Sequence, residues 1–148
     1  MKNKIPPPIL AIVSIYFMYA LKDLFPNFSF PYQNLVASLI GIEALFIVFV
    51  SAREFKKLKT TISPIKLSEV SSLVTNGTYK FSRNPMYLAL ISIQVAFGIY
   101  LGNWLFVILI ILFAFYMTKY QIIPEEYALL EKFGNEYKEY CSITGRWL

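Results

Sequence analysis

The sequence predicts an all-helical integral membrane protein, with four transmembrane helices and a cytoplasmic amphipathic helix at its C-terminal end. Hydrophobic residues make up 57% of the 148 residues, and charged residues only 16%. A soluble domain carries about one quarter charged residues, because it must cover its surface with solvated groups. The apolar residues also come in four long blocks, as helices within a bilayer require.

The four apolar blocks predict the four helices. They cover approximately residues 8–24, 35–52, 86–101 and 104–120. Crossing the hydrocarbon core takes about 20 helical residues, or about 17 at the short end, so the last two blocks are near the lower limit. Only Gly102 and Asn103 separate these two, which indicates a tight helical hairpin. We expect residues 1–148 to form a single membrane domain.

The distribution of positive charge predicts the topology, because cytoplasmic loops carry an excess of Lys and Arg. Lys2 and Lys4 precede the first block and four basic residues follow the second, whereas residues 26–34 contain none. We therefore expect both termini, the loop 53–85 and the tail 121–148 to be cytoplasmic, in the plasma membrane of a prokaryote. The net charge of +5 then fits anionic lipid headgroups better than nucleic acid.

The residue types exclude several kinds of active site. The sequence has no histidine and one cysteine, Cys141. These counts exclude a His-based catalytic triad, a His metal site and a cluster of metal-binding cysteines. The sequence also has neither a Rossmann turn nor a P-loop. We expect no bound metal.

The loop 53–85 is long for a simple connection, and loops of this length tend to be functional or disordered. It ends at Asn84 and Pro85, which suit the N-cap and the first residue of the third helix. Arg83 would then lie near the membrane surface, at the mouth of the bundle.

The tail carries apolar residues at spacings of three and four, which predict an amphipathic helix over residues 124–140. Glu125 and Glu126 would stand in its first turn, where negative charge is favourable. The helix would lie on the bilayer or pack under the bundle.

Eight polar or aromatic residues on the cytoplasmic side are candidates for a functional site. They are Arg83, Asn84, Tyr87, Glu125, Glu126, Tyr137, Tyr140 and Arg146. They would meet if the tail helix folded back beneath the third and fourth helices. Each type has a structural alternative: arginines contact lipid headgroups, glutamates stabilise helix starts, and tyrosines anchor helices at the interface.

Glu43 lies in the middle of the second block. A carboxyl group within a bilayer is costly and by default suggests a function. The alternative is a protonated group bonded to a neighbouring helix. We favour this structural role, since no other polar residue is expected at its depth.

Two cytoplasmic segments and the hairpin between them resemble a known superfamily. LVTNGTYKFSRNPMYLAL (residues 73–90) precedes the hairpin, and PEEYALLEKFGNEYKEY (residues 124–140) and Arg146-Trp147 follow it. This order is similar to that of the isoprenylcysteine carboxyl methyltransferase and phospholipid N-methyltransferase superfamily. Its pattern is roughly G-P-Y-x-x-x-R-H-P-x-Y-x-G, a hairpin, and E-E-x-x-L-x-x-x-F-G-x-x-Y-x-x-Y. The sequence departs from it at Asn84, which replaces histidine, at Thr78, which replaces proline, and at Ala89, which replaces glycine.

The resemblance implies a helical bundle that binds S-adenosylmethionine at its cytoplasmic end. Methyl transfer to a lipophilic or membrane-embedded carboxylate, amine or thiol would follow by in-line displacement. The expected catalytic residues are Arg83 and Arg146, with Arg146 orienting a substrate carboxylate or phosphate. The expected cofactor-binding residues are Asn84, Pro85, Tyr87, Glu125, Glu126 and Tyr137.

Two other functions stay open. An NADPH-dependent sterol reductase shares this architecture in its C-terminal half, but such enzymes are longer and lack the paired glutamates Glu125 and Glu126. A non-enzymatic membrane protein, such as a transporter subunit, would carry ionisable groups at the midplane, where the sequence places only Glu43.

Overall fold

The computed structural model describes residues 5–60 and 70–148, and within them all regular secondary structure is helical. The α-helices are α1 (Pro7–Ala20), α2 (Gln33–Lys57), α3 (Pro85–Leu101), α4 (Leu105–Tyr116), α5 (Ile123–Phe133) and α6 (Asn135–Ile143). The shorter elements are the 3-10 turns η1 (Lys22–Leu24) and η3 (Gly77–Lys80) and the π-helical segment η4 (Met117–Ile122). The all-helical fold class is confirmed for the described residues.

Two helices are long and apolar enough to cross a bilayer. They are α2, with 25 residues, and the continuous helix Leu105–Phe133, with 29 residues; their apolar windows of 18 residues have mean hydropathies of 2.4 and 2.0. Only 17% and 22% of their apolar windows are buried within the protein, whereas the core helix of a soluble domain is mostly buried. α1 and α3 are shorter apolar helices. These features indicate a membrane protein.

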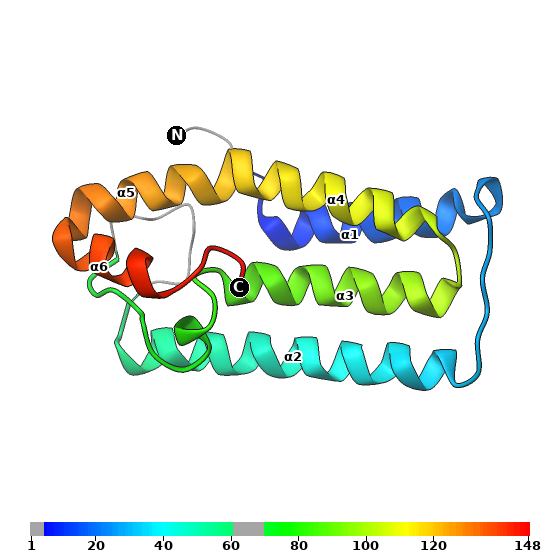
Figure 1. Ribbon diagram of the computed structural model, residues 1–148, viewed down its shortest axis with the longest axis horizontal. Coiled ribbons are helices and arrows are strands. Elements are labelled where there is room, and N and C mark those ends of the chain that lie inside the picture. Colours follow the sequence, from blue (N-terminus) through cyan, green and yellow to red (C-terminus); the bar gives the residue numbers. More distant parts are fainter. Residues whose placement is uncertain (1–4, 61–69) are drawn as a thin grey trace.

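α3 is the central helix of the bundle and packs against α1, α2 and α4. Figure 1 shows these four helices side by side, with α5 and α6 at the end where α1 and α3 begin and α2 ends. Small residues allow the close contact between α2 and α3: Ala44 is fully buried, and a Cβ atom on Gly41 would lie 3.8 Å from Cβ of Ala96. The end that carries α5 and α6 is where the candidate residues gather.

The opposite end is closed by the turn between α3 and α4. Gly102 has a φ of 64°, and a Cβ atom there would lie 2.5 Å from the carbonyl oxygen of Phe28, so the turn requires glycine. Asn103 is 2% exposed and donates to the backbone oxygen of Phe25 and to Oδ1 of Asn27, both at 2.9 Å. The turn is thereby joined to the connection between α1 and α2.

The C-terminal third differs from the expected arrangement. No break follows residue 120, because the π-helical segment η4 continues α4 directly into α5. The expected single helix over residues 124–140 is instead two helices, since Gly134 has a non-helical φ of 53° and ψ of −118°. Glycine adopts this conformation without the steric cost that a side chain would impose. The break turns α6 back toward the start of α3 (Figure 1).

Candidate functional site

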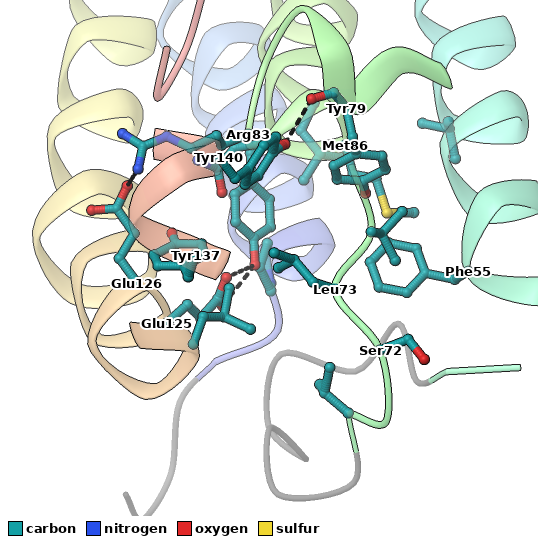
Figure 2. Close-up of a pocket in the computed structure, with 18 of the residues that line it drawn as sticks. Phe55, Ser72, Leu73, Tyr79, Arg83, Met86, Glu125, Glu126, Tyr137 and Tyr140 are labelled. Atoms are coloured by element: carbon teal, nitrogen blue, oxygen red, sulfur yellow. Dashed lines mark hydrogen bonds and ion pairs between the residues drawn. The ribbon is translucent and has the colours of Figure 1, made fainter. Parts of the chain in front are cut away.

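A cavity of about 270 Å³ lies at the end of the bundle that carries α5 and α6. Its wall comes from every α-helix except α4, and from the segment that precedes α3. The lining residues are Pro7, Pro8, Val48, Phe55, Val70, Ser72, Leu73, Val74, Tyr79, Arg83, Asn84, Met86, Tyr87, Leu90, Glu125, Glu126, Leu129, Tyr137 and Tyr140. Figure 2 shows Glu125, Glu126 and Tyr137 on one side of the cavity and Phe55 on the other. The cavity therefore has one polar side and is otherwise mainly apolar.

The segment before α3 is held by the C-terminal tail. The backbone N–H of Arg83 donates to the carbonyl oxygen of Gly145 at 3.0 Å. Asn84 stands at the N-cap of α3, but its side chain makes no capping bond and instead donates to the carbonyl oxygen of Arg146 at 2.9 Å. These bonds between residues far apart in the sequence fix Arg83 in the cavity wall.

Glu126 joins two arginines. Arg146 donates to its two carboxylate oxygens, from Nε at 3.0 Å and from Nη2 at 2.7 Å. Nη1 of Arg83 lies 3.2 Å from Oε1 of the same group. The side chains of Arg83 and Glu126 are 14% and 16% exposed, and that of Arg146 is 38% exposed. The bidentate hydrogen bond with Glu126 raises the pKa of Arg146 further above its usual value.

Arg83 also has an unused hydrogen-bond donor. Its Nε atom is buried and has no hydrogen-bond partner among the described residues. On the same side chain, Nη1 donates to Sγ of Cys141. A buried donor without a partner costs about 1–3 kcal/mol, which a ligand oxygen would recover. Arg83 is also one of the residues that line the cavity.

Glu125 is held by neutral donors from two helices. The hydroxyl of Tyr87, in the first turn of α3, donates to both of its carboxylate oxygens, at 2.8 and 3.0 Å. Nε2 of Gln121 also donates to Oε1. Gln121 is 4% exposed and lies in the π-helical segment, one turn before Glu125. π-helical turns recur at functional sites, and here the turn places a buried amide beside the carboxylate.

Three buried tyrosines complete the polar side of the cavity. They are Tyr79, Tyr137 and Tyr140, called here the wall tyrosines. Each is at most 6% exposed, and the hydroxyl of Tyr140 donates to the carbonyl oxygen of Tyr79 at 2.7 Å. Burial raises the pKa of all three phenols well above the usual value. They stay protonated at neutral pH, so a general base among the lining residues must be one of the two carboxylates, Glu125 or Glu126.

The structure brings most of the candidate residues together. Arg83, Asn84, Tyr87, Glu125, Glu126, Tyr137 and Tyr140 all line the cavity. Pro85 does not line it and is buried at the start of α3. Arg146 does not line it either; its side chain contacts Glu126, which is itself a lining residue.

Sequence analysis missed two kinds of residue at this site. Gln121 stands four positions before Glu125, and this spacing on a continuous helix was the signal that could have identified it. Val48 and Phe55 of α2 line the cavity from across the bundle. Ordinary apolar residues in an apolar helix carry no such signal.

Comparison with known proteins identifies the family. The model of the phospholipid methyltransferase family matches residues 32–136, which is more than two thirds of the chain. An uncharacterized protein of Haemophilus influenzae (strain ATCC 51907 / DSM 11121 / KW20 / Rd) is 41% identical over 63 residues, covering 43% of this chain and all of that protein. No solved structure matches. The matched region includes Arg83, Glu125 and Glu126, and the chain therefore belongs to the phospholipid methyltransferase family, which implies a membrane methyltransferase.

Proposed function

We propose that this protein is an S-adenosylmethionine-dependent methyltransferase that acts on a lipophilic or lipid acceptor at the cytoplasmic face of the membrane. The observation that carries the proposal is the pairing of Arg83 with Glu126 in the wall of a largely apolar cavity, in a chain of the phospholipid methyltransferase family. We assign this cavity as the cofactor site.

The residues present fit this cofactor. S-adenosylmethionine carries a carboxylate, an ammonium group, ribose hydroxyls and an adenine ring. The buried Nε donor of Arg83 suits the carboxylate, because a hydrogen bond between two charged groups is among the strongest in proteins. Glu126 suits the ammonium group or the hydroxyls, and the apolar side with Phe55 suits the adenine.

When bound, S-adenosylmethionine supplies a methyl group on a positively charged sulfur. The protein must align the reacting groups and exclude water. Arg83 orients the ligand's carboxylate, and the wall tyrosines together with Leu129 exclude water from the site. For an amine acceptor, Glu125 is the proposed proton acceptor, oriented by Tyr87 and Gln121. A carboxylate acceptor needs no base.

The charge distribution supports a cytoplasmic location for the cavity. The end of α2 at the cavity carries Arg53, Lys56 and Lys57, all exposed. The connection at the other end, residues 26–34, has no Lys or Arg. By the positive-inside rule, both termini lie in the cytoplasm. We propose that α1, α2, α3 and the helix that begins with α4 cross the plasma membrane of a prokaryote as one domain.

Binding measurements test the cofactor assignment. The purified protein in lipid nanodiscs is titrated by calorimetry with S-adenosylmethionine, S-adenosylhomocysteine and, in parallel, NADPH. We expect saturable binding of the first two, lost in Arg83→Ala and Glu126→Ala. Binding of NADPH alone would favour a reductase, and binding of none of the three would refute the proposal.

A further inference from the structure

The exposed face of α2 carries a regular apolar pattern that the proposed function does not use. Six large apolar side chains of α2 are exposed: Leu45, 63% exposed, stands beside the other five, which are Leu35, Leu39, Ile42, Phe46 and Phe49, each 56–65% exposed. The spacing of these five alternates between four and three residues, which is the spacing of the a and d positions in helices that pair with a left-handed crossing. In a membrane, however, lipid tails cover apolar side chains equally well, so this pattern alone does not require a partner.

Glu43 lies beside this pattern and is exposed. It stands ten residues after Gln33, about 15 Å along the helix, which is half of the roughly 30 Å hydrocarbon core. α2 packs on α3 through a different face, which contains Gly41 and Ala44. Among the described residues of the chain, none forms a hydrogen bond or ion pair with Glu43. Lipid tails offer no hydrogen-bond partner, so this carboxyl group needs one from beyond residues 5–60 and 70–148 of its own chain.

A second copy of α2 supplies such a partner at the right depth. The seven positions of the heptad repeat are lettered a to g. If Leu39 and Phe46 occupy position a and Ile42 occupies position d, Glu43 stands at position e and Ser38 at position g. In a parallel pair of helices, a g residue faces the e residue that stands five positions later in the partner helix. Ser38 of one copy would therefore face Glu43 of the other, and Ser38 is exposed as this requires.

We propose that the protein forms a two-fold symmetric dimer through α2, with Ser38 of each copy hydrogen-bonded to Glu43 of the other. Two-fold symmetry makes the bond twice, because the same surface of both copies meets. A hydroxyl can donate to a carboxyl group, so each of these two bonds gives Ser38 and Glu43 a partner within the bilayer. A different protein would need its own polar group at this depth, whereas a second copy always brings Ser38 and Glu43.

Cysteine cross-linking in liposomes of synthetic lipid tests the geometry. The background is Cys141→Ser, which removes the single native thiol. Ile42→Cys places a thiol in the proposed interface, and Ile111→Cys on α4 is the matched control, because the two side chains are 64% and 62% exposed. We expect Ile42→Cys to form a disulfide-linked dimer at least tenfold faster than Ile111→Cys. Equal rates would overturn the proposal.

Exchanges at the polar pair test its role. Glu43→Gln keeps a group that donates and accepts, and we expect its dimer fraction, measured by fluorescence energy transfer, to match the wild type. Glu43→Leu and Ser38→Ala remove the bonds, and we expect each to weaken dimerisation about tenfold. Unchanged helical circular dichroism shows that these variants fold. A purified protein that stays monomeric, or a Glu43→Leu dimer as stable as the wild type, would overturn the proposal.

Discussion

Replacing Arg83 by lysine keeps a positive charge beside Glu126 but removes the guanidinium group from the cavity wall. In the wild type, Nη1 of Arg83 lies 3.2 Å from Glu126 while the buried Nε has no hydrogen-bond partner among the described residues. A lysine ammonium is a compact charge at the end of a flexible chain and has no donor at the position of Nε. The variant should lose the proposed hydrogen bond to the cofactor carboxylate and retain the ion pair.

The size of the effect follows from that one bond. A hydrogen bond to a charged group contributes about 1.5–3 kcal/mol, which corresponds to a loss of about 10- to 100-fold in affinity at 25 °C. Arg146→Lys is the matched control, because Arg146 binds the same carboxylate but does not line the cavity and is 38% exposed. We expect it to weaken binding less than about threefold, since it removes no ligand contact.

Calorimetric titration of both variants with S-adenosylhomocysteine, in nanodiscs, measures the difference. The thermal midpoint of each variant is recorded in parallel, so that a loss of folded protein is not taken for a loss of affinity. Wild-type affinity in Arg83→Lys would refute the role of Nε. Equal losses in the two variants would mean that the arginines act only through Glu126.

Three further predictions concern the wall and the fold. Tyr87→Phe removes the hydroxyl that donates to Glu125 at 2.8 and 3.0 Å. We expect the methyl-transfer rate to be about tenfold lower and the cofactor affinity to be nearly unchanged. A loss of cofactor affinity instead would place Glu125 in cofactor binding. The wall tyrosines have pKa values raised above the unfolded value near 10, so the stability that they contribute is complete below about pH 10 and falls above it, by up to about 1.4 kcal/mol per tyrosine and pH unit. Thermal midpoints measured from pH 8 to 11 should therefore fall above pH 10, and more gently in Tyr79→Phe, whereas identical profiles would contradict the assignment. Gly102→Ala should lower the thermal midpoint of unfolding more than Gly134→Ala. Both glycines have a positive φ, but of the two only Gly102 would bring the added Cβ against other atoms, with the carbonyl oxygen of Phe28 at 2.5 Å. Equal shifts of the thermal midpoint would show that the turn between α3 and α4 can relax.

The all-helical fold could be predicted because it rests on a local property, whereas the gathering of the candidate residues was predicted from the family resemblance. An apolar block long enough for a bilayer has few alternatives to a helix, so the blocks locate the helices. Arg83, Glu125 and Glu126 stand out because ionisable residues next to such blocks are not needed for insertion. The family resemblance then placed them in one site.

The remaining features depend on contacts that no local pattern encodes. The apolar spacing of the tail predicted a separate helix that begins at Pro124; the structure instead continues from α4 through the π-helical segment, and Pro124 stands near the start of α5. Gly134 fitted an amphipathic helix by spacing, but its backbone conformation ends α5. Phe55 reaches the cavity because α2 packs along α3, which is a property of the assembled bundle.

Methyl transfer into lipid tests the central claim most directly. Nanodiscs of prokaryotic membrane lipids that contain the protein are incubated with S-adenosylmethionine labelled in its methyl group, and the lipids are then extracted. The account predicts label in the lipid fraction with the wild type and near-background label with Arg83→Ala. Lipid label no higher than in nanodiscs without protein would contradict it, even if the cofactor binds.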